Sequence, residues 1–352
     1  MTGRQLRRSL RIGIEDALHN LRYRGASRRI LVVRHAARYK RIYNSHFLAW
    51  VRARVPAAAP LFELRRLPCR VGDWRRYALF LPWLQDPLNR FDPRLYRYAR
   101  EMERRCEALG IPVVNPVDAL SRSVKSVASE IMRAAGVRTP RMVPIADVEV
   151  FRKTLGGLAP PVIVREDDRH RGASFLVERP ADLDRVPFER LSAPVAVEFV
   201  DVRSPDGLYR AYRYLAIGDR GFPCFLAVSP SWEARGEDEP TDTAVEEELA
   251  FLNGDDPNHD ALQHARRALG FDIVAFDYSY DAEGRLVVWE ANPFPTIWGQ
   301  DNYLAYMRYA DPFIERIYVG LLTYYLERAG MAASIPMPVR GAGAALDTLF
   351  GV

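Results

Sequence analysis

IVAFDYSYDAEGRLVVWEANPFP, residues 273–295, is the stretch that decides the fold. Two runs rich in β-branched and aromatic residues flank the sequence DAEG, which predicts a β-hairpin with residues 281–284 as its loop. This loop places Asp277 opposite Val288, and residues two apart on a strand share a face. Three side chains that carry oxygen are therefore expected on one side of the hairpin: Asp277, Glu290 and Asn292.

These three side chains predict a cation site. An isolated carboxylate in so apolar a hairpin would cost much free energy, so a positive partner is expected beside it. Oxygen ligands without His or Cys suit Mg²⁺, with Mn²⁺ as an alternative, and Mg²⁺ completes its shell with water and substrate phosphates. The other interpretation is that the three residues cap the strand end or pair with arginines.

Length and composition indicate a folded protein of two or three domains. The chain has 352 residues, of which 48% are hydrophobic. It contains no apolar run long enough to span a bilayer and no apolar segment of a signal peptide near its start, so we expect a cytoplasmic protein without a membrane partner. The three cysteines lie far apart, which suggests neither disulfides nor a zinc site: Cys69, Cys106 and Cys224.

The charges argue against a nucleic-acid partner. The net charge of +5 is spread along the chain, with acidic stretches between basic ones. Only three basic residues are lysines, and all the others are arginines. The Arg-rich segment 4–24 predicts an amphipathic helix, for which a solvated surface is favoured over an acidic partner.

The first third of the chain predicts a small α/β domain. After the opening helix, residues 28–55 suggest a strand, a loop and a helix. Residues 77–84 and 110–116 suggest two more buried strands, with a helix at 93–110 between them.

The rest of the chain is rich in predicted strands. Ser121 or Ser123 is expected to cap a helix that runs through Ala135 and ends at Gly136. Strands follow, then a helical stretch from Thr241 to Gly270, the hairpin, and a helix at 311–330. The expected divisions are an N-terminal helical extension, an α/β domain, two β-rich subdomains and a tail: residues 1–28, 29–117, 118–200, 201–330 and 331–352.

The order of four motifs resembles the ATP-grasp superfamily, in particular its glutathione-synthetase-like carboxylate–amine ligases. The motifs are AAGVRTP (134–140), PVIVRE (161–166), VAVEFV (195–200) and the hairpin with its preceding ALGFD. The resemblance covers residues 115–298. It implies an α/β (α+β) chain with the ATP-grasp fold, in which an N-terminal open-sheet domain precedes two β-rich subdomains that enclose ATP.

The resemblance assigns residues to the nucleotide phosphates. Lys125 is similar to the first family lysine, and Arg165 stands where the family has a second lysine, keeping the charge with a different geometry. The loop 166–175 stands where the family has a glycine-rich flap. It retains Gly172, and His170 and Arg171 are expected to supply side-chain donors.

Further positions follow from the same resemblance. Glu198 would accept from the adenine amino group, the backbone near Val200 would complete that recognition, and Asp201 or Asp206 would bind the ribose. Arg213 corresponds to an arginine near the phosphates, and Arg235 to one that steadies the reacting phosphate. The metal ligands would be the three residues of the hairpin: Asp277, Glu290 and Asn292.

The implied activity is ATP-dependent amide formation through an acyl phosphate, which releases ADP and phosphate. The alternatives are an ATP-grasp kinase and a nucleotide-binding module without catalysis. Carboxylate and amine substrates, small or peptidic, are the expected partners, and a homodimer is left open. Three residues are candidate carboxylate anchors on the acceptor side: Arg34, His35 and Arg38.

Overall fold

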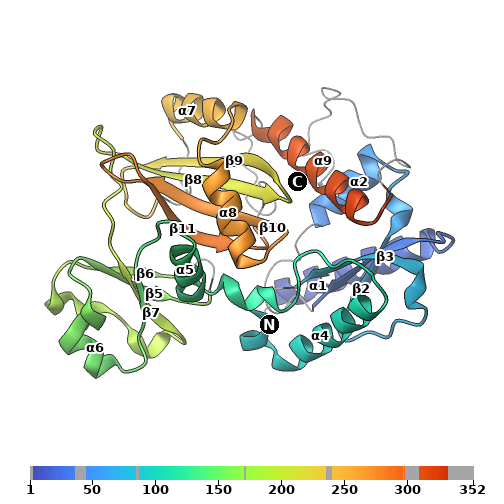
Figure 1. Ribbon diagram of the computed structural model, residues 1–352, viewed down its shortest axis with the longest axis horizontal. Helices are drawn as coiled ribbons and strands as arrows, with labels where there is room; N and C mark the ends of the chain where they lie inside the picture. The colour runs from blue at the N-terminus through green and yellow to red at the C-terminus, as the bar shows by residue number, and fades with distance from the viewer. Residues whose placement is uncertain are drawn as a thin grey trace.

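The computed structural model describes residues 3–35, 45–84, 87–169, 172–234, 240–295, 297 and 309–331. Three sheets organise these residues, as Figure 1 shows: a parallel sheet of the N-terminal domain at the right, a large antiparallel sheet above, and a small antiparallel sheet at the lower left. None of the described helices is long and apolar enough to cross a membrane.

The N-terminal domain is a three-stranded parallel sheet in the order β2-β1-β3. Its strands are β1 (Arg29–Arg34), β2 (Phe62–Arg66) and β3 (Tyr77–Trp83), and its helices are α1 (Gly3–Arg22), α2 (Ser45–Arg54), α3 (Leu88–Phe91) and α4 (Pro93–Ala108). Every residue of β1 and of β3 is buried, as expected of strands covered on both faces. Helix α1 contacts the edge strand β2, and α4 contacts β3.

Two predictions for this domain are wrong. Residues 110–116 form no strand but a single parallel bridge, in which Val113 pairs with Phe80. Pro112 and Pro116 lack the N–H groups that a longer ladder needs. Strand β2 is absent from the prediction because three of its five residues (FELRR) are charged. One of these charges pairs inside the fold, where Arg29 Nη1 donates to Glu63 Oε2 at 2.9 Å.

Two antiparallel sheets follow along the chain. The small sheet has the order β4-β7-β5-β6 and the large sheet the order β11-β10-β8-β9. The small sheet contains β4 (Met142–Pro144), β5 (Val162–Glu166), β6 (Ser174–Val177) and β7 (Pro194–Glu198). The large sheet contains β8 (Tyr209–Ile217), β9 (Arg220–Ser229), β10 (Ile273–Tyr280) and β11 (Leu286–Asn292).

Helices join and cover these sheets. They are α5 (Lys125–Ala134), α6 (Val148–Thr154), α7 (Asp242–Asn253), α8 (His259–Leu269) and α9 (Asp311–Arg328). Helix α5 lies where the two antiparallel sheets meet and contacts β4, β11 and α8 (Figure 1). The predicted helix from Thr241 to Gly270 is two helices, because Gly254 ends α7 and Pro257 precedes α8.

The start of α5 corrects another prediction. Neither Ser121 nor Ser123 caps the helix; both lie in a 3₁₀ turn (Ala119–Ser123), and their hydroxyls donate to backbone carbonyls there. Helix α5 begins at Lys125, and Asp167 receives hydrogen bonds from its first turn. Its end agrees with the prediction, since Gly136 follows with φ of 78°.

One hydrophobic core is shared by the N-terminal domain and the large sheet, whereas the small sheet has separate clusters on its two faces. Asn115 joins the domain to the large sheet. Its Nδ2 donates to Ile273 O at 2.7 Å and to Pro293 O at 3.2 Å, and its Oδ1 accepts from the Asp272 and Ile273 amides at 2.9 Å each.

Candidate functional site

The hairpin places its oxygen-bearing side chains on one face, although by a different register from the predicted one. Val288 pairs with Tyr278, and a bulge between Asp277 and Tyr278 then brings Glu290 opposite Asp277. Asn292 pairs with Ala275, two residues from Asp277. Since opposite residues and residues two apart share a face, Asp277, Glu290 and Asn292 lie on the same side of the sheet.

Strand β8 supplies Arg213 directly opposite Asp277 on the other side of β10. Arg213 Nε donates to Asp277 Oδ1 at 2.5 Å, and Nη2 donates to Oδ2 at 2.8 Å. Burial alone would lower the pKa of Arg213, but the Asp277 carboxylate outweighs burial and raises it. The pair is therefore a fixed two-bond ion pair of the kind that Arg forms with carboxylates.

Glu290 connects the two antiparallel sheets. Its Oε1 lies 3.9 Å from Lys125 Nζ, and its Oε2 lies 3.7 Å from Arg165 Nη2. Lys125 opens α5 and Arg165 lies on β5 of the small sheet, while Glu290 lies on β11 of the large sheet. Three cationic side chains and two carboxylates thus gather where the sheets meet, and we call them the ion cluster: Lys125, Arg165, Arg213, Asp277 and Glu290.

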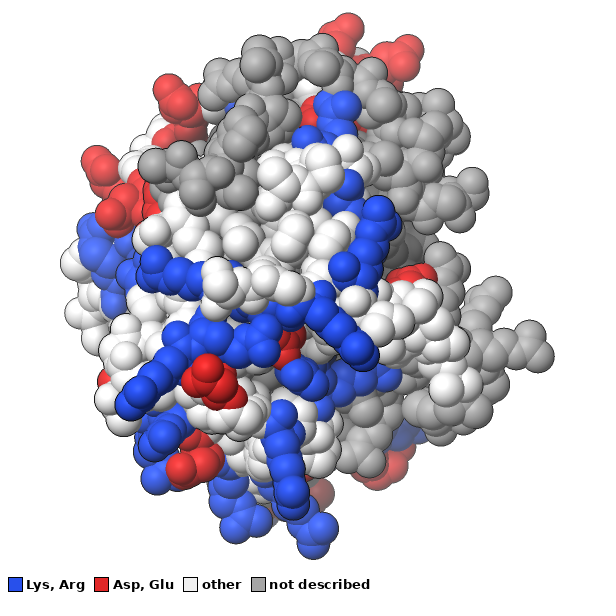
Figure 2. All heavy atoms as spheres, turned by 90° about the vertical axis from the view of Figure 1, so that its right-hand side faces the viewer, with Lys and Arg blue, Asp and Glu red and all other residues white. Residues whose placement is uncertain are grey.

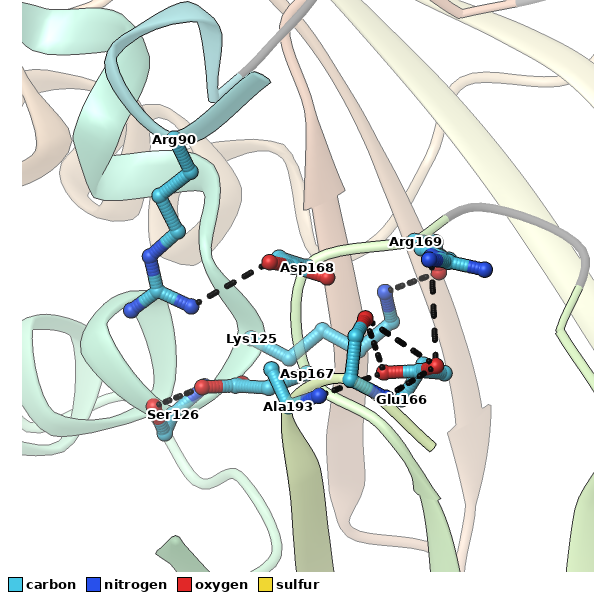
Figure 3. A network of polar contacts seen from close by, with 9 residues as sticks. Arg90, Lys125, Ser126, Glu166, Asp167, Asp168, Arg169 and Ala193 are labelled. Carbon is cyan, nitrogen blue, oxygen red and sulfur yellow. Dashed lines mark hydrogen bonds and ion pairs between the residues drawn. The ribbon is translucent and has the colours of Figure 1, made fainter. Parts of the chain in front are cut away.

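The segment after β5 holds Lys125 in place, as Figure 3 shows. The Lys125 side chain is 1% exposed, and its Nζ donates to Arg169 O at 2.8 Å. Asp167 Oδ1 accepts from Ser126 N at 2.8 Å and Oδ2 from Ser126 Oγ at 2.7 Å, so this carboxylate caps α5 from a distant part of the chain.

Glu166 anchors the same segment (Figure 3). Its carboxylate accepts from the Ser192 and Ala193 amides at 2.9 Å each, and both Glu166 and Asp167 are 4% exposed. The sequence pattern predicts no function for these two acids. Their signal was the acidic run EDD at the end of a buried strand, where solvated charges would not be expected.

Asn292 is buried, and its Oδ1 accepts from Phe294 N at 2.9 Å. This bond fixes the amide oxygen at the end of β11, beside Glu290. A carbonyl oxygen has two lone pairs, so the backbone bond leaves Asn292 Oδ1 with a second acceptor site.

The small sheet has a buried apolar cluster on the face that carries Arg165. Ile163 lies two residues before Arg165, and the register pairs Val197 with Ile163 and Val195 with Arg165. Ile163, Val195 and Val197 are buried and form one cluster with partly buried neighbours: Met142, Leu176, Phe199 and Trp232.

Several predicted residues lie apart from the ion cluster. Glu198 is exposed and accepts from Arg141 N at 2.9 Å through its carboxylate. Asp206 is exposed and pairs with Arg210 at 2.8 Å, which together with the Leu208 amide lowers its pKa to about 2. Asp201 pairs with the exposed Arg203 at 3.2 Å.

Val200 is half-buried in the connection between β7 and β8. Gly172 follows the anchored segment, and a Cβ added to it would lie 3.6 Å from the Glu166 side chain, an ordinary contact that leaves room for a larger residue. Four predicted residues lie outside the described residues: Arg38, His170, Arg171 and Arg235.

The proposed acceptor residues lie at the end of β1. Arg34 is buried, and its Nη1 donates to Asp16 Oδ1 at 3.2 Å. Burial raises the pKa of Asp16 and lowers that of Arg34, each opposed by the charge of the other. His35 is also buried.

The donor set at the ion cluster fits a magnesium nucleotide. Among the described residues, no group of three or more His, Cys, Asp or Glu could hold a metal ion alone. Two carboxylates and an amide oxygen are what Mg²⁺ takes when phosphate oxygens complete its shell. Lys125, Arg165 and Arg213 are cationic side chains of the kind that bind phosphates.

No protein-family model and no curated protein matches the sequence. Solved structures do match the fold. The ATP-grasp ligase PsnB complexed with minimal precursor is 16% identical, with a TM-score of 0.53 over 84% of this chain and 99% of that chain. D-alanine–D-alanine ligase from Bacillus anthracis complexed with ATP is 16% identical, with a TM-score of 0.51 over 86% and 96%.

The VanG D-Ala:D-Ser ligase from Enterococcus faecalis is 13% identical, with a TM-score of 0.51 over 87% of this chain and 99% of that chain. These identities establish the fold alone. The chain has the ATP-grasp fold: an N-terminal parallel-sheet domain followed by two antiparallel-sheet subdomains.

Proposed function

We propose that the chain is an ATP-dependent carboxylate–amine ligase that forms an amide bond through an acyl phosphate and releases ADP and phosphate. One observation carries the proposal: the ion cluster joins cations and carboxylates from both antiparallel sheets at one place. The fold shared with three ATP-grasp ligases, one of them complexed with ATP, supports it.

In this proposal, different residues of the chain bind the adenine, the ribose and the phosphates of the nucleotide. The adenine lies beside the small sheet. Glu198 and the backbone near Val200 complete its recognition, and Asp201 or Asp206 binds the ribose. The phosphates contact Lys125 and Arg165, with Gly172 and Arg171 in the loop that follows β5.

Asp277, Glu290 and Asn292 hold Mg²⁺ in this proposal. When bound, the metal neutralises phosphate charge and orients the γ-phosphate. Arg213 and Arg235 stabilise negative charge on the group being transferred to the substrate carboxylate, so positioning and electrostatics supply most of the catalysis. An amine then attacks the acyl phosphate, and exclusion of water by the loop around Gly172 protects it.

Calorimetric titration tests the metal assignment. We expect MgATP to bind the native protein and Glu290→Gln to weaken that binding by at least about tenfold, or about 1.4 kcal/mol. ATP without Mg²⁺ is more negative, so it should bind Glu290→Gln no worse than it binds the native protein. The matched control is Glu283→Gln, in the exposed turn of the same hairpin, which should bind MgATP normally.

Titration with and without Mg²⁺ distinguishes a metal ligand from a residue that only supports the fold. Equal weakening with and without Mg²⁺ would show that Glu290 supports the fold and does not hold the metal. Absence of ATP binding to the native protein would refute the proposed function.

A second candidate function is nucleotide binding without catalysis. It is favoured because two of the proposed metal ligands are already bonded to other groups of the protein. Both Asp277 oxygens pair with Arg213, and Asn292 Oδ1 accepts a backbone bond. A screen of acid and amine pairs for ADP release separates the candidates. Amide and free phosphate support the ligase, a phosphorylated substrate indicates a kinase, and binding without ADP release supports the second candidate.

A further inference from the structure

Helix α1 presents its apolar side to solvent. Four large aliphatic side chains on it are more than half exposed: Leu10 58%, Ile14 59%, Leu18 59% and Leu21 53%. At about 100° per residue, these positions fall within an arc of about 80° on one side of the helix. We call them the aliphatic stripe of α1.

Three polar residues on the opposite side of α1 bond to the sheet. The Asn20 amide donates to Leu64 O at 2.7 Å and accepts from Leu64 N at 3.0 Å, as a neighbouring strand would. His19 Nε2 lies 2.9 Å from Phe62 O, and Asp16 pairs with Arg34. Because α1 attaches to β2 through polar groups, its aliphatic stripe takes no part in the described core.

The stripe is unusual within this protein. Of the seven exposed large hydrophobic residues in the described part of the chain, four belong to the stripe. The other three lie singly in different parts of the chain, at the end of α4, on α5 and on α6: Leu109, Val127 and Val150. Scattered apolar residues need no explanation, but a contiguous exposed stripe marks an interaction surface.

The charged residues near the stripe indicate which kind of partner it binds. Residues 3–28 contain seven arginines but only two acids, Glu15 and Asp16, and Asp16 is buried against Arg34. Figure 2 shows the end of the molecule that the N-terminal domain forms, where blue basic side chains dominate the described charged groups. A second copy of the chain would bring like charges together, whereas an anionic amphiphilic surface matches both the stripe and the arginines.

We infer that α1 docks the protein on an anionic membrane surface. The aliphatic stripe enters the boundary between headgroups and acyl chains, and the flanking arginines contact lipid phosphates. The sequence alone favours a solvated helix and predicts no membrane partner, and the outward direction of the stripe changes this interpretation. The inference is independent of the nucleotide site, and α1 lies on the surface without crossing the bilayer.

Vesicle sedimentation with the full-length chain tests the inference. We expect binding to vesicles of phosphatidylcholine mixed with phosphatidylglycerol, weakened by NaCl, and little binding to phosphatidylcholine alone. Replacing two stripe residues, Ile14→Gln with Leu18→Gln, should weaken vesicle binding by about tenfold or more. Both side chains are exposed, so the variant should keep the circular dichroism of the native protein.

The matched control is Val150→Gln. Val150 is 56% exposed on α6, at the far end of the molecule from the N-terminal domain (Figure 1), and its replacement should leave vesicle binding unchanged. Failure of the native protein to bind the anionic vesicles, or equal binding by the stripe variant, would overturn the inference. A native dimer that Ile14→Gln converts to a monomer would assign the stripe to a second copy and overturn it as well.

Discussion

At the scale of residues, the Arg213–Asp277 pair is the most strongly bonded part of the ion cluster. The two side chains are 24% and 28% exposed. Removing one partner from such a pair leaves the other charge without compensation in a partly dry environment. Solvent screens part of the attraction, so the coupling should be smaller than in a fully buried pair.

A double-mutant cycle measures this coupling. Arg213→Met and Asp277→Asn should each lower the free energy of unfolding by about 2 kcal/mol, and the double variant should lose less than the sum by about 1–2 kcal/mol. Urea unfolding gives these values. The exposed pair Arg203–Asp201 is the control cycle and should show no measurable coupling; additive losses in the Arg213–Asp277 cycle would contradict the structural assignment.

A second prediction at the scale of residues concerns Asn115. It is 3% exposed with φ of 57°, and its side chain serves four backbone groups that join the N-terminal domain to the large sheet. Asn115→Ala leaves those groups unpaired and should lower the free energy of unfolding by about 3–5 kcal/mol.

Asn115→Gly separates the two causes of that loss. Glycine tolerates the positive φ, so it should recover about 1 kcal/mol relative to alanine while still losing the hydrogen bonds. Full recovery by glycine would show that backbone conformation, and not the side-chain bonding, makes asparagine necessary at this position.

The site residues show what sequence can and cannot predict at this scale. The shared face of Asp277, Glu290 and Asn292 follows from strand alternation, which survives the bulge that changed the register. The Asp277 partner, Arg213, requires knowing that β8 lies beside β10. The Asp167 cap lies 41 residues from Ser126, and no local pattern connects them.

At the scale of elements, α1 depends on an uncharged histidine. Arg52 Nε donates to His19 Nδ1 at 3.3 Å, so the proton lies on Nε2, which donates to Phe62 O. Burial, as the largest cause, lowers the pKa of His19 to about 4. The folded state therefore resists protonation of a ring that the unfolded chain protonates near pH 6.5.

The low pKa of His19 determines how the free energy of unfolding changes with pH. Below pH 6.5 the unfolded state binds more protons than the folded state, so the free energy of unfolding falls as the pH falls toward 4. At pH 5, His19 should account for a loss of about 2 kcal/mol relative to pH 7.5. His19→Gln should flatten this dependence in urea unfolding, whereas His264→Gln, at an exposed position on α8, should keep it.

Errors in predicting the elements have a common cause. The strand predicted at 110–116 and the single helix from Thr241 to Gly270 were inferred from composition, and prolines interrupt both. Strand β2 was missed because its charged residues look solvated in sequence, whereas Glu63 pairs inside the fold with Arg29 and Arg65. Composition measures how apolar a segment is but does not show which charges find partners.

At the scale of the whole molecule, the order of the domains was predictable and their contacts were not. Each sheet follows from a local run of strand patterns, so the succession of an α/β domain and two β-rich subdomains could be inferred from the sequence. The two antiparallel sheets meet through Glu290, Arg165 and Lys125, which lie up to 165 residues apart. Such contacts appear only when the sheets are placed together.

The last prediction concerns the place where the two antiparallel sheets meet. A ligand that binds the ion cluster contacts both antiparallel sheets, so it should reduce their separate opening motions. Hydrogen exchange with MgATP should therefore slow together in β5 and β6 of the small sheet and in β11 of the large sheet, while α1 keeps its exchange rates. With Glu290→Gln the joint protection should disappear at the same MgATP concentration, whereas Glu283→Gln should retain it. Protection confined to one sheet would mean that the nucleotide binds away from the ion cluster, even if calorimetry detects binding.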